Sequence, residues 1–327
     1  MSGTRPLAVA VTPMETRREV VLRVATLAEE LGYRAFSVAE GWGSDAAVLL
    51  AEIATRTTRI ELATGVLNIW GRSPAGIAMV AAGLAEVSGG RFTLGLGAGS
   101  PQLAEGLHGV PFRAPVRRMA AVAREVRGLL DGERSVGSDG SRGLRLAVPP
   151  RSRVPLALAA LGPAAIRLCG ELADAWYPFL MPVSGLKEGM CLLEEGAART
   201  ARSRPQIHPG IPTAVLPDPD AASGVAAWWV VFYLTSMGPL YAATLRQRGF
   251  GEAVDAVVAA NPRGAPPTVP AAAQVLVDGL LVAGDAAAAR AGLDRWYAAG
   301  AEMPVLVLPP NRAVEELEFT LRTLRPR

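Results

Sequence analysis

Short apolar runs alternate with helix-period segments along most of the chain, and this alternation restricts the fold more than any other feature. The runs are rich in Val, Leu, Ile and Ala and lack polar alternation, which is typical of parallel strands buried on both faces. The expected strands are Leu7–Val11, Ala35–Ala39, Ile60–Val66, Phe92–Leu96, Leu156–Ala160, Ala175–Phe179, Thr213–Leu216 and Val305–Leu308. This count predicts an α/β protein with a (β/α)8 TIM barrel; an open doubly wound sheet is the alternative.

Helices are expected between these strands, for example at Arg17–Leu31, Ala46–Thr55, Ala75–Val87 and Val116–Leu130. Two stretches exceed a minimal barrel. Residues 132–153 are expected to form an inserted hairpin or loop, and residues 218–302 several helices inserted between strands 7 and 8. We therefore expect a single barrel domain over residues 1–327 with these two insertions.

Several common kinds of active site are excluded by composition. The one lysine, Lys187, lacks the Gly-Lys-Ser/Thr context of a phosphate loop. The two His and two Cys have no zinc-ligand spacing, so no metal site is expected, and no Gly-x-Ser-x-Gly elbow occurs. These exclusions favour an organic cofactor.

The partners are expected to be small molecules. The net charge of +3 comes without a long basic run, so we expect no nucleic-acid binding. Residues 221–245 are uncharged, but Thr235–Pro239 breaks them into segments too short to span a membrane. The two cysteines favour a reduced, cytoplasmic setting, and Leu7–Val11 is too short for a secretory signal.

Reactive groups in a TIM barrel come from the carboxyl ends of the strands. Glu40 ends the second expected strand and is the first candidate for a proton donor or a cofactor contact. His108 and Tyr177 are weaker catalytic candidates. Other candidates lie after strands and are assigned to a substrate pocket: Thr12, Trp42, Trp70 and Ser100.

Two backbone segments are candidates for cofactor binding. The first is a strand-to-helix turn of small residues whose free N–H groups suit a phosphate: Ala159, Ala160, Leu161, Gly162, Pro163 and Ala164. Arg72 is expected to assist it. The second contains Gly97 and Gly99 in LGLGAGS, which lacks the spacing of a nicotinamide fingerprint. These glycines are expected to line the barrel mouth, where a flat ring can lie against the backbone.

Four segments, in order, resemble the bacterial luciferase-like family of flavin and deazaflavin enzymes: AEELGYRAFSVAE, ATRTTRIELATGVLN, GRSPAGIAMVAAGLAEVSGGRFTLGLGAGSP and PLALAALGPAAIRLCGELADAW. The branch most similar is that of methylenetetrahydromethanopterin reductase-like enzymes, which use coenzyme F420. The resemblance implies a ring held in the mouth of one barrel and a phosphate at residues 159–164. It further implies a strand-3 bulge with a non-prolyl cis peptide at Gly65 and Val66, flanked by Thr64 and Asn68, and a homodimer.

Two positions depart from the family pattern. Gly41 stands where a His commonly follows the acid, and Ser100 stands near the place of a catalytic carboxylate in some members. The hypothesis is an F420-dependent oxidoreductase that transfers hydride between the deazaflavin and a C=C, C=N or C=O group of a small substrate. One alternative is an FMN-dependent monooxygenase. The other is a barrel repurposed as a cyclase, isomerase or binding protein, which a mouth blocked by Trp42 or Trp70 would favour.

Overall fold

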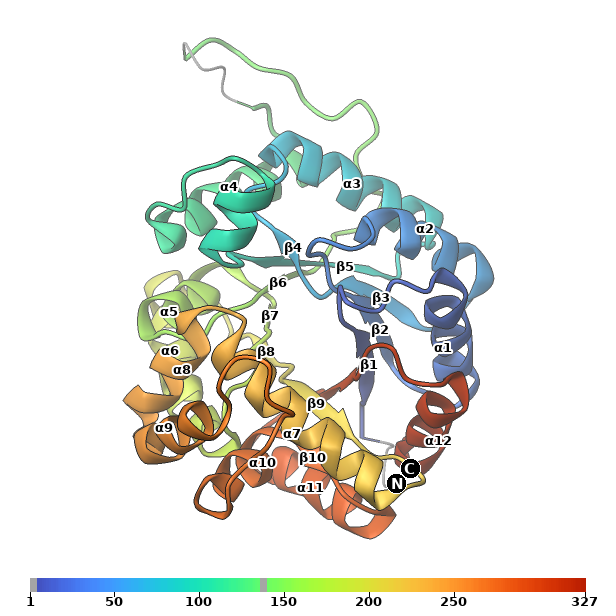
Figure 1. The fold of residues 1–327 in the computed structure, drawn as a ribbon. Helices are drawn as coiled ribbons and strands as arrows, with labels where there is room; N and C mark the ends of the chain where they lie inside the picture. The colour runs from blue at the N-terminus through green and yellow to red at the C-terminus, as the bar shows by residue number, and fades with distance from the viewer. Residues whose placement is uncertain (1–4, 136–139) are drawn as a thin grey trace.

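The computed structural model describes residues 5–135 and 140–327, in which parallel strands form one sheet surrounded by helices (Figure 1). The strands are β1 (Ala8–Val11), β2 (Ala35–Val38), β3 (Glu61–Thr64), β4 (Leu67–Asn68), β5 (Phe92–Gly97), β6 (Leu156–Leu158), β7 (Ala175–Trp176), β8 (Gln206–Ile207), β9 (Gly210–Ala214), β10 (Val282–Ala283) and β11 (Val305–Leu308). Their order is β10-β9-β11-β1-β2-β3-β5-β6-β7-β8, with β4 paired to β5.

The sheet closes into a barrel through the continuous run of residues 206–214. The first part of this run, β8, pairs with β7, and the second part, β9, pairs with β11. A parallel bridge between Phe179 and Gly210 strengthens the same seam. The (β/α)8 TIM-barrel prediction is therefore confirmed.

Helices cover the outside of the barrel (Figure 1). They are α1 (Arg18–Glu30), α2 (Ala46–Arg56), α3 (Pro74–Val87), α4 (Pro115–Leu130), α5 (Pro163–Leu172), α6 (Leu186–Arg199), α7 (Pro219–Thr235), α8 (Pro239–Leu245), α9 (Gly251–Ala260), α10 (Gln274–Leu280), α11 (Ala286–Ala298) and α12 (Val314–Leu324). Sequence-coded caps set their starts: the Asp45 carboxylate accepts from the backbone of α2, and Ser73 caps α3 ahead of Pro74.

Arg91 fastens the amino ends of β3 and β5 to the helix layer. Its guanidinium donates to the carbonyl oxygens of Ala54, Thr57 and Ile60 at 2.7–3.1 Å. It also donates to the Ser88 carbonyl and the Thr57 hydroxyl. The carbonyls at the end of α2 thus receive donors that the helix itself cannot supply.

Both expected insertions are present in the described residues. Between β9 and β11 lie α7 to α11 with the short strand β10. Residues 132–135 and 140–153, between α4 and β6, extend away from the barrel (Figure 1). There, Ser135 N donates to Leu144 O at 2.9 Å and Gly143 N to Ser135 O at 3.1 Å, as in a hairpin; residues 136–139 lie outside the described part.

The expected seventh strand, Thr213–Leu216, is misplaced by a few residues. The structure begins it at Gly210 and continues it backwards, through His208 and Pro209, into β8. Proline has no N–H to donate, so a strand containing it looks like a loop in the sequence. The Glu302 side chain stands in for a strand partner here, because its carboxylate accepts from Ile207 N at 2.8 Å.

No single helix among the described residues is long and apolar enough to cross a membrane. One pair, Pro219–Thr235 with Pro239–Ala260, reaches that length and composition together, but is bent by 103° between its halves. The bend falls at the break that the sequence predicts.

Candidate active site

Glu40 lies directly after β2, at the carboxyl edge of the barrel, with its side chain 8% exposed. Its Oε1 accepts from the Arg72 guanidinium, which also donates to Asp45 Oδ2 at 2.6 Å. The hydrogen bond to Glu40 raises the pKa of Arg72. Arg72 thus pairs with two carboxylates in this structure; its help in holding a phosphate stays a prediction. The second oxygen of Glu40, Oε2, is buried and has no partner among the described residues.

Asn68 connects Glu40 to the loop after β4. Its Oδ1 accepts from the backbone N–H groups of Trp70 at 3.0 Å and Gly71 at 2.7 Å. Its Nδ2 lies 3.4 Å from Glu40 Oε1 and 3.2 Å from His108 Nε2. The amide is 2% exposed, and all four of its hydrogen-bonding positions are used within the protein. Contact of Asn68 with a cofactor stays a prediction.

His108 reaches this cluster from the π-helical turn η1 (Gln102–Leu107) that follows β5. The Ser100 hydroxyl accepts from Leu103 N at 3.3 Å at the start of this turn. The imidazole lies against Gly71, where an added Cβ would stand only 2.6 Å from His108 Cε1. The structure therefore brings Glu40, Asn68 and His108 together, as expected for a common site.

A bulge joins β3 to β4, and the expected cis peptide between Gly65 and Val66 is present in it. The Thr64 hydroxyl bonds both to the N–H and to the carbonyl of Gly95, each at 2.8 Å. A Cβ on Gly97 would stand 2.3 Å from Val66 Cγ2. The glycines of β5 thus make room for the bulge; contact of Gly97 and Gly99 with a ring stays a prediction.

Residues 159–162 form the turn before α5, and Pro163 and Ala164 are the first residues of that helix. The N-cap residue, Gly162, forms no side-chain hydrogen bond to the helix. Arg248 lies beside this turn: its Nη2 donates to the Leu161 carbonyl at 3.4 Å, and its side chain is 10% exposed. Glu188 holds the other end of the guanidinium. A cation next to free N–H groups at a helix N-terminus suits a phosphate. The sequence analysis missed Arg248, which lies in the insertion, 87 residues after Leu161.

Tyr177 is not brought to Glu40. Its ring lies 5.7 Å from that of His208, and burial together with the charge of Glu61 raises its pKa. Glu61 is the first residue of β3, at the end of the barrel opposite to Glu40. His208 is 7% exposed, contacts Gln206 at 3.0 Å through Nε2, and has a buried Nδ1 without a partner in the described chain.

The expected pocket residues differ in exposure. Trp70 is buried, donates from Nε1 to the Ala98 carbonyl at 2.6 Å, and packs on Phe112 with ring centroids 5.1 Å apart. Trp42 is 54% exposed. Thr12 is buried, and its hydroxyl accepts from Met14 N at 3.3 Å. Trp70 is thus a packing residue of the loop, whereas Trp42 is free to contact a ligand.

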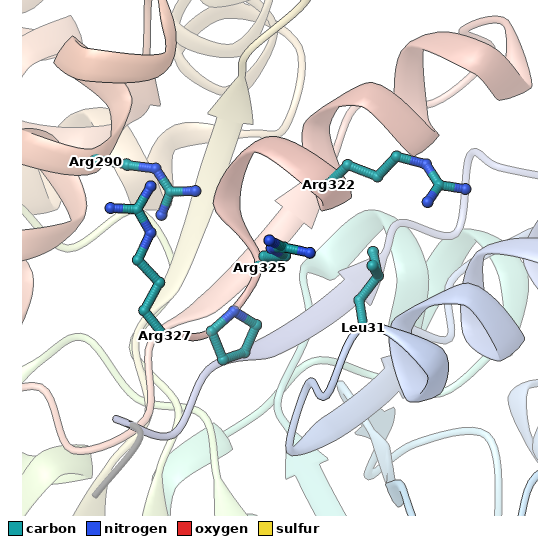
Figure 2. Close-up of a pocket in the computed structure, with 6 residues that line it drawn as sticks. Leu31, Arg290, Arg322, Arg325 and Arg327 are labelled. Carbon is teal, nitrogen blue, oxygen red and sulfur yellow. The ribbon is translucent and has the colours of Figure 1, made fainter. Parts of the chain in front are cut away.

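A cavity of 620 Å³ lies at the other end of the barrel, where α1 and α12 finish (Figure 2). Figure 2 shows Arg290 and Arg327 with their guanidinium groups close together at its edge. It is remote from Glu40, and none of its described lining residues has a carboxylate side chain. No group of three or more His, Cys, Asp or Glu side chains in the described part of the chain is placed to hold a metal ion.

Comparison with known proteins gives matches over almost the whole chain. A Mycobacterium tuberculosis protein assigned as a coenzyme F420-dependent oxidoreductase is 32% identical over 320 residues, which cover 89% of this chain and 91% of that protein. The F420-dependent tetrahydromethanopterin reductase of Methanopyrus kandleri has the same fold, with a TM-score of 0.78 at 18% identity over 98% of both chains. An FMN complex of the oxygenating constituent of 3,6-diketocamphane monooxygenase from Pseudomonas putida aligns with a TM-score of 0.72 at 15% identity, over 98% of both chains.

The family assignment rests on the sequence as a whole. Residues 6–303 match the family model for luciferase-like monooxygenases. This range contains every strand of the barrel except β11, together with the bulge, the Glu40 cluster and the turn before α5. The resemblance in the sequence is confirmed: the chain belongs to the bacterial luciferase-like family.

Proposed function

We propose that this chain is an oxidoreductase that binds F420 at the carboxyl edge of the barrel and transfers hydride between it and a small organic substrate. The group of the substrate that accepts the hydride, or that forms when hydride is removed, is a C=C, C=N or C=O bond. The full-length similarity to the M. tuberculosis protein supports F420 over FMN. The family and the FMN complex of the same fold support a flavin-type cofactor in general.

The observation that carries the proposal is the buried Glu40 Oε2 without a partner. Leaving such an atom unsatisfied costs about 1–3 kcal/mol, more for a charged group. Oε1 already receives donors from Arg72 and Asn68, so Oε2 is the oxygen of Glu40 that is left for a ligand. The ring systems of F420 and FMN both carry an imide N–H, which is a donor that would satisfy it.

The turn before α5 fits the phosphate that both cofactors carry. Its small residues, Gly162 and Ala164 among them, let an anion approach the backbone N–H groups of the helix N-terminus. Arg248 supplies a charge at the same place. The two contacts would hold the cofactor at both ends, and this fixes its orientation.

Each part of the protein has a defined task in this reaction. The bound cofactor supplies the hydride chemistry. Glu40 orients the ring through Oε2, and Arg72 holds the Glu40 side chain in place. Buried neighbours such as Leu67, Ile69 and Leu96 give this edge an apolar surrounding, which strengthens each polar contact.

Separate titrations of F420 and FMN test the proposal, followed by oxygen consumption with reduced FMN. We expect F420 to bind in the micromolar range, at about −8 kcal/mol. Oxygen consumption with FMN would support the monooxygenase instead. Failure of both cofactors to bind at tens of micromolar would exclude redox chemistry and leave a repurposed barrel.

Glu40→Gln sharpens the test. Arg72 and Asn68 both donate toward Oε1, so the glutamine must keep its oxygen there and place its NH2 group where Oε2 was. A ligand N–H then meets a donor, and we expect affinity to fall about tenfold, or ~1.4 kcal/mol. Asp45→Asn is the matched control, because it removes the other carboxylate on Arg72 without touching Oε2.

We also propose a cytosolic homodimer that acts on a small molecule. The support is an aromatic face on α7, where the partly exposed Trp228 and Phe232 stack with ring centroids 5.1 Å apart. Light scattering on the purified protein gives the oligomeric state directly.

A further inference from the structure

We propose that Asn68 is a positioning residue that fixes the tautomer of His108, so that the proton of the neutral imidazole is on Nδ1 and Nε2 presents its lone pair. What His108 then does to a substrate rests on the proposed function. The state of the imidazole itself does not, since it follows from hydrogen bonds within the protein.

The orientation of the Asn68 amide is determined by its surroundings. Its Oδ1 receives two backbone N–H groups, from Trp70 and Gly71, and these can only donate. Exchanging the oxygen and nitrogen of the amide would set an NH2 group against both of them. It would also turn Oδ1 toward the Glu40 carboxylate. Nδ2 therefore faces His108 and Glu40.

This orientation determines the tautomer of His108. The amide N–H approaches Nε2 at 3.2 Å, so Nε2 must present its lone pair. A neutral imidazole has one lone pair and one N–H group, so the proton is on Nδ1. A proton on Nε2 would bring two donors, Nε2–H and the Asn68 amide N–H, within 3.2 Å of each other with no acceptor between them. No residue in the described part of the chain accepts from Nδ1 in return.

Two backbone features hold the imidazole in this position. The π-helical turn η1 brings His108 back over the loop after β4, with its own N–H bonded to Leu103 O at 3.2 Å. Gly71 leaves the space for the ring, because any Cβ there would overlap Cε1, Nε2 and Nδ1. The cluster thus depends on a glycine that makes no side-chain contact of its own.

A neutral imidazole with Nδ1–H is a hydrogen-bond donor and a poor acid, because loss of that proton would leave an imidazolate. Neutral histidines can polarise a carbonyl in this way. When hydride adds to the carbon of a C=O or C=N group, the displaced electron pair moves to the heteroatom. His108 stabilises that charge by a hydrogen bond, and a water molecule supplies the proton. The site therefore favours carbonyl or imine substrates over isolated C=C bonds.

Nitrogen NMR of the unliganded protein tests the tautomer. The chain has two histidines, so a 15N-imidazole spectrum contains two spin systems, and His108→Gln identifies which one belongs to His108. At neutral to mildly alkaline pH we expect His108 to show a protonated Nδ1 and an unprotonated Nε2. A protonated Nε2, or an even mixture of both tautomers, would overturn the proposal.

Two substitutions separate this geometry from a general structural role. Asn68→Asp replaces Nδ2 by an acceptor, so the His108 proton should move to Nε2. Gly71→Ala keeps every hydrogen-bonding group but displaces the ring, and should give the tautomer mixture of a free imidazole. Gly83→Ala is the matched control, because a Cβ there meets nothing within 4 Å. An unchanged His108 spectrum in Gly71→Ala would contradict the proposal, even where Asn68→Asp fails to fold.

These spectra need no cofactor, so the two proposals fail separately. If F420 and FMN do not bind but His108 has the expected tautomer, the proposed function falls and the role of Asn68 stands. If a cofactor binds and the tautomer is reversed, the role of Asn68 falls alone. Where both hold, Asn68→Asp should lower the rate on a carbonyl substrate more than cofactor affinity.

Discussion

The burial of His208 predicts that the protein loses stability in weakly acidic solution. Burial lowers the pKa of His208 to about 4, against 6.5 for an exposed imidazole. Between these values the unfolded chain binds a proton that the folded protein does not. The contribution of the neutral, buried His208 to the free energy of unfolding is therefore fully present above pH 6.5 and is lost progressively as the pH falls towards 4.

The size of the effect follows from the difference in pKa. At about 1.4 kcal/mol for each pKa unit, the full contribution is about 3 kcal/mol. Between about pH 7.5 and pH 5, roughly 2 kcal/mol of it should be lost. The carboxylates of Glu15 and Asp174, whose pKa values are lowered by hydrogen bonds that outweigh burial, lose their contributions at lower pH.

Urea unfolding of the wild type and His208→Asn, at several pH values across this window, measures the effect. The substitution changes the packing on Tyr177 and so alters the absolute stability, but that cost does not vary with pH. We expect the wild type to lose about 2 kcal/mol more than the variant over this interval. Equal slopes for the two proteins would refute the reasoning and show that His208 is charged within the fold.

Three further substitutions give expected outcomes. Arg91→Met removes the donors to five acceptors around α2 and β3, and should lower the free energy of unfolding, measured by thermal unfolding, by about 3 kcal/mol. A decrease below about 1 kcal/mol would contradict the proposed contribution of Arg91 to stability. Arg248→Met should weaken cofactor binding about tenfold in the same titration that tests the proposed function, whereas Arg246→Met, in the same turn but paired with the exposed Asp255, should not. Gly97→Ala places a methyl group 2.3 Å from Val66 Cγ2, and should shift the bulge and reduce cofactor affinity while circular dichroism stays native; unchanged affinity would separate the bulge from the site.

The barrel was predictable because its strands are marked by composition alone. Apolar runs such as Ala35–Val38 are buried on both faces and lie within one residue of their expected ends. The strand of residues 206–214 was harder to place, since it contains His208, two prolines and a glycine. Its first half pairs with β7 and its second half with β11, and the Glu302 carboxylate accepts from Ile207 N between them; no local pattern encodes such long-range contacts.

Of the candidate site, too, the sequence predicts one part and not the other. Glu40 follows β2, and Asn68 ends β4, which continues β3, the neighbour of β2, beyond the bulge; the sequence order alone therefore brings them together. Tyr177 also follows a strand, but its side chain turns into the barrel towards His208, and the direction of one side chain is not set by the strand pattern. Arg248 reaches the turn before α5 because the inserted helices pack back over it. The partner of Arg72, Asp45, is the N-cap of α2, and this pairing is not encoded in the local sequence around either residue.

The contact between Arg248 and Leu161 has a consequence for protein engineering. The insertion between β9 and β11 looks like an appendage that could be exchanged among relatives, because it enters and leaves the barrel at its own strands. Yet it carries the cation for a turn that belongs to the other half of the chain, and Glu188 on α6 holds that cation in place. A chimera that transplants the insertion alone would break this three-way contact. The unit to exchange is therefore the insertion together with the segment from Leu161 to Glu188.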